Sequence, residues 1–295
     1  MGATLTKETQ ASGGGSDQSV YIRVRGLSYC YNPATPQEQT ALSEVDLDLY
    51  KGEFLALVGA NASGKSTLAR HFNALLTPSS GTVTVDGMDT AKPEYLWEIR
   101  QRVGMVFQNP DNQIVSSLVE EDVAFGVENL GLPSSQVRQR VEEALSLTGL
   151  TNFRQHAPFM LSGGQKQRLA IAGVLAMRPQ CLVLDEPSSM LDPVGRRELT
   201  GIIMDLNRSK GVTVVLATHF MEEAALADRV LIMSDGRISM AGAPAEVFRD
   251  EARIRKVGLE LPFTAKIAHS LRRRGILLPE EGIVDLKELV SFLCR

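Results

Sequence analysis

The chain has 295 residues, of which 43% are hydrophobic and 22% are charged, as is usual for a soluble globular protein. This length allows one large domain, or one domain with an appendage. The net charge of −4 and the pI of about 5.7 exclude a global basic field, so nucleic acid is not expected as a partner. No apolar run approaches the roughly 18 residues that a membrane-spanning helix needs, so any work at a membrane would require a partner protein.

Polar, glycine-rich residues 1–19 open the chain and predict a disordered leader, either native or a remnant of cloning. Alternating polar and apolar residues predict strands over 21–25 and 45–49. Residues 82–85 predict another strand, which ends at the hairpin turn Asp86-Gly87. We therefore expect antiparallel strands in the first third of the chain, lying beside an α/β core.

Residues 59–67 fit the pattern G-x-x-x-x-G-K-S/T at every fixed position. An apolar run of strand length, 53–58, precedes this loop, and apolar residues at helical spacing follow it. Glycines let the backbone wrap a phosphate chain, the new helix points unpaired N–H groups at it, and Lys65 adds a cation. The loop therefore predicts a site for a nucleoside triphosphate, with the Ser66 hydroxyl available to Mg²⁺. The expected binding residues are Gly59, Asn61, Ala62, Ser63, Gly64, Lys65, Ser66 and Thr67.

The middle of the chain predicts a helical subdomain, over about residues 109–178, inserted into the α/β core. A strand predicted over 103–107 ends at Gln108. Apolar residues between Val137 and Leu145 then recur at helical spacing.

The segment Leu161-Ser162-Gly163-Gly164-Gln165 predicts a capped helix start. Ser162 precedes the helix and Gln165 stands three positions later, which is the reciprocal capping pattern. Two glycines would let another molecule approach the exposed N–H groups closely. The segment therefore predicts a second anion-binding helix terminus, distant in sequence from the phosphate loop.

Residues 181–184 are fully apolar and end in Asp185-Glu186, as expected for a buried strand of a parallel sheet. Ligands collect at the carboxyl ends of such strands. Asp185 fits the carboxylate on the Mg²⁺ side of phosphate-loop enzymes, and Glu186 is placed to orient water. A second buried strand is predicted over 212–217, shortly before His219.

In this order, these motifs resemble the nucleotide-binding subunit of ATP-binding cassette (ABC) transporters, over about residues 20–240. The resemblance implies an α/β fold, with a P-loop NTPase core of ABC type, an antiparallel β subdomain and a helical subdomain. Residues 241–295 would form a small C-terminal helical extension. It also implies an ATP hydrolase that uses ATP and Mg²⁺.

A narrower resemblance is to the ATPases of energy-coupling factor transporters, which are bacterial importers of vitamins and metal ions. It rests on residues 108–113 and 119–126, and on the tail segments 242–248 and 258–262. Within that group, the loop after Gln108 is closer to the first of two ATPase types. The chain departs from the family at Met190, where a small residue is usual, and in the leader.

The resemblance implies a role for each motif. The catalytic residues would be Lys65, Gln108, Glu186 and His219, with Glu186 acting as base or water positioner. The Mg²⁺ ligands would be Ser66, Gln108 and Asp185. Tyr31 would stack on adenine, with Tyr29 as an alternative. The residues Ser162, Gly163, Gly164 and Gln165 would close on the ATP of a partner subunit, in a head-to-tail dimer.

The implied partners are a second ABC ATPase subunit, in a homodimer or a heterodimer, a transmembrane coupling protein and a substrate-capture membrane subunit. The chain would be peripheral to the cell membrane, on its cytoplasmic side. Glu120, Glu121 and Asp122 are a candidate docking surface for a basic helix of the coupling protein; the alternative is a solvated helix start. The transported substrate is not encoded here, because a separate subunit captures it.

The tail predicts a helix with an apolar stripe formed by Leu286, Leu289, Val290 and Leu293. The stripe could support dimer contacts or pack on its own domain. Three other functions share these motifs: a soluble assembly-scaffold ATPase, the ATPase of an ordinary ABC importer, and a DNA-repair or chromosome-organising ATPase. Long coiled coils would interrupt the cassette of the last class, and sustained heptads are absent from this sequence.

Overall fold

The computed structural model describes residues 19–279 and 282–294, so the leader expected over 1–19 lies almost wholly outside the described residues. In this part of the chain, no helix combines the length and apolar character that crossing a membrane requires.

An antiparallel sheet forms from the first third of the chain, as predicted. Its strand order is β2-β1-β4-β5, and β1 pairs with both β2 and β4. Ile22 and Val24 of β1 are fully buried while Arg23 between them is exposed, because successive side chains of a strand point to opposite faces. The strands are β1 (Val20–Tyr31), β2 (Gln39–Tyr50), β4 (Ser80–Val85) and β5 (Met88–Asp89).

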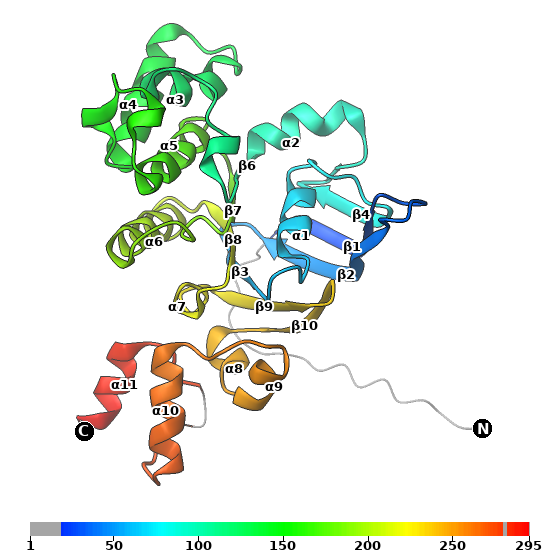
Figure 1. Ribbon diagram of the computed structural model, residues 1–295, viewed down its shortest axis with the longest axis vertical. Helices are drawn as coiled ribbons and strands as arrows, with labels where there is room; N and C mark the ends of the chain where they lie inside the picture. The colour runs from blue at the N-terminus through cyan, green and yellow to red at the C-terminus, as the bar shows by residue number, and fades with distance from the viewer. Residues whose placement is uncertain (1–18, 280–281, 295) are drawn as a thin grey trace.

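A second, mostly parallel sheet forms the centre of the molecule, with strand order β10-β9-β3-β8-β7-β6 (Figure 1). Only β9 and β10 pair antiparallel among these described strands. Every residue of β3, β7 and β8 is buried. The strands are β3 (Phe54–Val58), β6 (Val103–Val106), β7 (Cys181–Asp185), β8 (Thr213–Thr218), β9 (Arg229–Ser234) and β10 (Arg237–Gly242).

Strand β3 separates two hydrophobic cores. Phe54, Ala56 and Val58 pack with residues of the helices α5 (Gly163–Ala176) and α6 (Pro193–Arg208). The alternate residues Leu55 and Leu57 pack with α1 (Lys65–Phe72) and with the antiparallel sheet. Burial on both faces explains why this strand is continuously apolar rather than alternating.

The helical subdomain predicted from the sequence stands at one end of the central sheet (Figure 1). Helices α3 (Val119–Glu128), α4 (Ser134–Leu147) and α5 share a hydrophobic cluster of their own. Because β6 ends at Val106 and β7 begins at Cys181, we propose the boundaries 109–178 for this subdomain. Short elements complete the connections: η1 (Pro93–Tyr95), α2 (Leu96–Arg102), η2 (Pro110–Asn112), η3 (Thr151–Phe153), η4 (Pro158–Met160) and α7 (Met221–Ala224).

The C-terminal extension is helical, as predicted, and lies beyond β10 (Figure 1). Its first part joins the main core, since Phe248 and Ile254 are fully buried there. In the predicted stripe of the last helix, Leu289 is buried, whereas about half of the surface of Leu286, Val290 and Leu293 is exposed. The stripe therefore does not pack fully on its own domain. The helices are α8 (Pro244–Val247), α9 (Glu251–Lys256), α10 (Phe263–Arg273) and α11 (Leu286–Leu293).

Candidate active site

The phosphate loop connects β3 to α1, as its position between an apolar run and a helical pattern predicted. A Cβ atom at Gly59 would lie 2.5 Å from the carbonyl oxygen of Met233, so only glycine fits beside β9. Gly64 has a φ of 102° and caps α1 without any side-chain hydrogen bond. The N–H groups of the first helical turn have no partner within their own helix and are suited to an anion.

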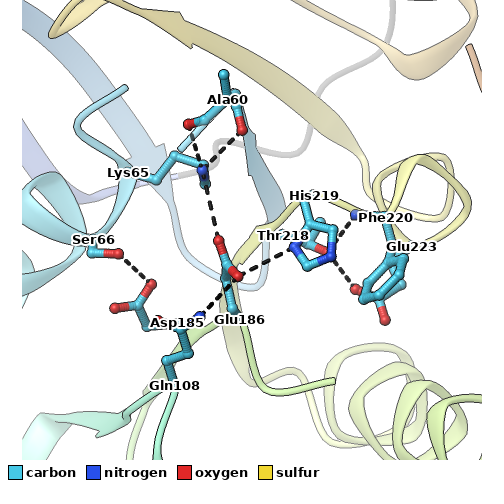
Figure 2. A network of polar contacts seen from close by, with 11 residues as sticks. Ala60, Lys65, Ser66, Gln108, Asp185, Glu186, Thr218, His219, Phe220 and Glu223 are labelled. Carbon is cyan, nitrogen blue, oxygen red and sulfur yellow. Dashed lines mark hydrogen bonds and ion pairs between the residues drawn. The ribbon is translucent and has the colours of Figure 1, made fainter. Parts of the chain in front are cut away.

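Lys65 is the buried cation of this loop, with 4% of its surface exposed. Its Nζ donates hydrogen bonds to the carbonyl oxygens of Gly59 and Ala60, at 2.9 and 3.0 Å, and lies 3.7 Å from Glu186 Oε1 (Figure 2). Burial lowers the pKa of Lys65, while the carboxylates of Glu186 and Asp185 act in the opposite direction. An anionic ligand would stabilise the charged form further.

Ser66 and Asp185 meet across the site, as expected for two residues on the Mg²⁺ side. The Ser66 hydroxyl donates a hydrogen bond to Asp185 Oδ1 at 2.7 Å (Figure 2). Burial raises the pKa of the Asp185 carboxyl, and the hydrogen bond from Ser66 partly opposes that shift. A hydroxyl and a carboxylate are oxygen ligands that suit Mg²⁺, which completes its shell with waters and phosphate oxygens.

Glu186 is the centre of the polar network (Figure 2). Its Oε2 accepts a hydrogen bond from Gln108 Nε2 at 3.2 Å and lies 3.2 Å from His219 Nδ1. The φ of Glu186 is 48°, a conformation that is unfavourable for a side chain with a Cβ atom, and its N–H is held by the carbonyl of Ala217. This strained backbone directs the carboxylate toward Lys65.

Strand register explains why these residues converge. Val106 of β6 is paired with Leu184 of β7. Gln108 and Glu186 each lie two residues beyond this pair. Asp185 is paired with Ala217 on β8, which brings His219 to the other side of Glu186. The four predicted catalytic residues, Lys65, Gln108, Glu186 and His219, are therefore adjacent although they are far apart in sequence.

Thr218 and Glu223, which support the turn that carries His219, were not singled out from the sequence. The Thr218 hydroxyl donates to Glu223 Oε2 at 2.6 Å and accepts from the N–H of Phe220 at 3.0 Å (Figure 2). Glu223 has only 4% of its surface exposed, and the Phe220 ring lies 4.1 Å from the His219 ring. The pair fixes the turn after β8 from which His219 projects.

Tyr31, rather than Tyr29, lines the cavity above the phosphate loop. The cavity has a volume of about 420 Å³ and is also lined by Gln108 and Glu186. The Tyr31 hydroxyl lies 3.3 Å from Thr67 Oγ1. Gln39 and Ala41 line the same cavity, and no motif in the sequence marks either of them.

The second glycine-rich segment does not join this cavity. The capping prediction is confirmed, because Gln165 N–H donates to Ser162 Oγ at 3.3 Å and Ser162 N–H donates to Gln165 Oε1 at 2.8 Å. Ser162 and Gly163 are exposed at the start of α5. Residues 162–165 are therefore not among those that line the nucleotide cavity of their own chain.

The three acidic residues expected to form a docking cluster lie in different environments. Asp122 is buried, and its Oδ1 accepts backbone hydrogen bonds from residues 115 and 116 at 2.7 and 3.0 Å. Glu120 forms an ion pair with Arg154 at 2.7 Å. The expectation of one exposed acidic patch is therefore wrong for Asp122, whose carboxylate orders the preceding loop.

A mostly parallel sheet with a phosphate loop after β3 and the carboxylate pair Asp185-Glu186 at the end of β7 defines a phosphate-loop ATPase. The family described as "ABC transporter" matches residues 42–189. An energy-coupling factor transporter ATP-binding protein, EcfA1, of Caldanaerobacter subterraneus is 52% identical, over 93% of this chain and 99% of the relative. EcfA1 of Symbiobacterium thermophilum is 57% identical, over 93% of this chain and 97% of the relative.

Solved structures agree with this likeness. The structure of cbiO1 from Clostridium perfringens, described as part of the ABC transporter complex cbiONQ, has a TM-score of 0.72 and 38% identity. The match covers 86% of this chain and all of the cbiO1 chain. The ATP-binding cassette MJ0796, in a dimeric post-hydrolysis state with ADP and Pi, has a TM-score of 0.70 and 30% identity, over 76% of this chain and 98% of its own.

The chain belongs to the ABC transporter family and, within it, to the ATP-binding proteins of energy-coupling factor transporters. The predicted fold class and the predicted ATP-hydrolysing activity are thereby confirmed. Because the similarity extends through the tail, the scaffold, ordinary-importer and DNA-repair alternatives are not favoured.

Proposed function

We propose that this ATPase uses Mg²⁺ and ATP to power uptake of a vitamin or a metal ion, through closure of an ATP-bound dimer. The observation that carries the proposal is the convergence of Lys65, Gln108 and His219 on the Glu186 carboxylate. Phosphoryl transfer depends on alignment and charge neutralisation more than on covalent help from the protein. The polar network around Glu186 supports both the alignment and the charge neutralisation.

The metal would be held by Ser66, Gln108 and Asp185. When bound, Mg²⁺ would supply positive charge that neutralises the phosphates. Burial raises the pKa of Asp185, so an added counter-charge would favour its charged form. A divalent cation beside the Ser66 hydroxyl would provide it.

Each catalytic side chain has a task that its contacts support. Lys65 would exchange the carbonyl oxygens of Gly59 and Ala60 for phosphate oxygens. Glu186 would orient the attacking water or accept its proton. Gln108 and His219 hold the Glu186 carboxylate from two sides, and His219 would also contact the γ-phosphate.

The exposed start of α5 supports a composite site. Ser162, Gly163, Gly164 and Gln165 do not line the cavity of their own chain. We propose that they close on the ATP of a second ABC ATPase subunit, in a head-to-tail homodimer or heterodimer. The related ATP-binding cassette MJ0796 is described as dimeric in a post-hydrolysis state with ADP and Pi.

We further propose that the ATPase is peripheral to the cell membrane on its cytoplasmic side, bound to a transmembrane coupling protein beside a substrate-capture subunit. A groove of about 950 Å³ at α3 and α4 is lined by Glu120, Glu121 and the exposed Phe125. Four glutamates outnumber the two arginines, Arg138 and Arg154, in this lining, and the excess of carboxylates beside apolar residues suits a basic, partly apolar helix of the coupling protein. The half-exposed stripe of α11 is proposed to support pairing between ATPase subunits.

Replacing Glu186 by Gln tests the central role. The amide keeps the size of the side chain but cannot act as a base, so ATP affinity should persist while turnover falls at least about a hundredfold. ATP should then trap a stable dimer, which size-exclusion chromatography with light scattering would detect. Turnover within a few-fold of the unmodified protein would contradict the role of Glu186.

A second variant separates catalysis from dimer closure. In the Glu186→Gln background, Ser162→Arg places a long cation at the exposed start of α5, far from the nucleotide cavity of the same chain. It should leave ATP binding by isolated chains intact and abolish the trapped dimer. If Ser162→Arg instead abolishes ATP binding by isolated chains, the composite site is wrong.

A further inference from the structure

A chain of aromatic contacts links Tyr31 to helix α1. The rings of Tyr31 and Tyr29 meet edge-on, with centroids 4.9 Å apart and an interplanar angle of 86°. Tyr29 meets the His71 imidazole in the same way, at 4.9 Å and 75°. Edge-to-face contacts are favourable and restrict the relative orientation of two rings.

His71 connects these rings to the phosphate loop. It is fully buried, and its Nδ1 lies 2.7 Å from the carbonyl oxygen of Thr67, a distance that requires Nδ1–H as the donor. Tyr31 also reaches Thr67, through the 3.3 Å contact between their hydroxyl groups. Tyr31, Tyr29, His71 and Thr67 therefore form a closed loop of contacts that joins β1 to the phosphate loop.

The backbone of Tyr31 pairs with Gln39 of β2, but its ring lies at the end of the strand and gains from further support. Tyr31 is the last residue of β1, and the residues from 32 to 38 that follow are exposed. Its side chain is only partly buried at the cavity. Burial lowers the pKa of His71, so this residue acts as a neutral ring and hydrogen-bond donor.

We propose that Tyr29 and His71 are positioning residues for the purine base of the nucleotide, holding the Tyr31 ring in the orientation that stacks on the base. The inference rests on the proposed stacking role of Tyr31. Through Thr67, these contacts also connect the base-binding ring to the helix start that would receive the phosphates. Base affinity is therefore expected to depend on residues that do not touch the nucleotide.

The test compares ATP with inorganic tripolyphosphate, which has phosphates but no base, by isothermal titration calorimetry on the full chain. Tyr29→Leu keeps apolar volume but removes the ring. It should weaken ATP binding about two- to tenfold, as expected from the loss of an aromatic pair. Tripolyphosphate affinity should be unchanged. Tyr29→Phe retains the ring and is the matched control, with ATP affinity equal to that of the unmodified protein.

Tyr31→Ala distinguishes failure of this inference from failure of the stacking role. If Tyr31→Ala leaves ATP affinity unchanged, the stacking role is wrong and the inference falls with it. If Tyr31→Ala weakens ATP binding and Tyr29→Leu does not, only the positioning inference is overturned. Equal weakening of ATP and tripolyphosphate by Tyr29→Leu would show a general structural role and would also overturn it. The double variant should bind ATP as weakly as Tyr31→Ala alone.

Discussion

Thr218 holds the turn after β8, and replacing it by valine should destabilise the fold and slow hydrolysis. Its hydroxyl makes a 2.6 Å hydrogen bond to Glu223 and receives a 3.0 Å hydrogen bond from the N–H of Phe220. Glu223 is buried, and its other carboxylate oxygen has no hydrogen-bond partner among the described residues. Valine would leave the Glu223 carboxylate without its donor and the Phe220 N–H without its acceptor.

The size of the effect follows from those two bonds. A lost hydrogen bond to a buried charged group costs about 1.5–3 kcal/mol, and one to a backbone N–H costs about 1 kcal/mol. We therefore expect Thr218→Val to lower the free energy of unfolding by about 2.5–4 kcal/mol. Because Phe220 adjoins His219, kcat should also fall while the KM for ATP stays nearly unchanged.

Urea denaturation and steady-state ATPase assays measure these effects, and the same strand offers a matched control. Thr213 is also buried on β8, but its hydroxyl makes one hydrogen bond, from the Gly52 N–H at 2.9 Å. Thr213→Val should cost about 1 kcal/mol and leave kcat unchanged. Adding Glu223→Leu to Thr218→Val removes the orphaned carboxylate and should recover part of the lost stability. A loss below about 0.5 kcal/mol in Thr218→Val would refute the reasoning.

Three further predictions concern binding and assembly. Lys65→Ala should weaken ATP binding at least about tenfold in calorimetry, because a charged hydrogen bond to phosphate is lost; unchanged affinity would exclude its role. Val290→Ser combined with Leu293→Ser should weaken nucleotide-independent pairing in light scattering without changing ATP affinity, and unchanged pairing would exclude this face as an interface. Glu121→Lys should spare soluble ATPase activity but weaken assembly with the membrane subunits, most strongly at low salt where the charges are least screened; normal co-purification would exclude the α3–α4 groove.

Two of these variants were chosen because of what the structure buries. Removing the tail from Gly242 onward would also remove Phe248 and Ile254, which belong to the main core, so surface substitutions on α11 are cleaner. Replacing Asp122 by lysine would break the loop that its carboxylate orders. Sequence position alone does not distinguish a solvated acidic residue from one that caps a buried loop.

The sequence by itself determined the local features whose geometry depends on adjacent residues. The phosphate loop needs glycine at residue 64, where the backbone φ is 102°, and the Ser162–Gln165 cap closes within four residues. The continuous apolar character of residues 181–184 also predicted a strand buried on both faces. Such features are visible in sequence because hydrogen bonds and backbone angles over a few residues decide them.

Only the tertiary structure decided which distant side chains meet. The neighbouring positions of β6, β7 and β8 bring Gln108 and His219 to Glu186, and the ring contacts of Tyr29 leave Tyr31 as the residue that lines the nucleotide cavity. It also showed that Asp122 is buried. These outcomes depend on strand order, on register and on packing between segments far apart in the chain, which no short stretch of residues specifies.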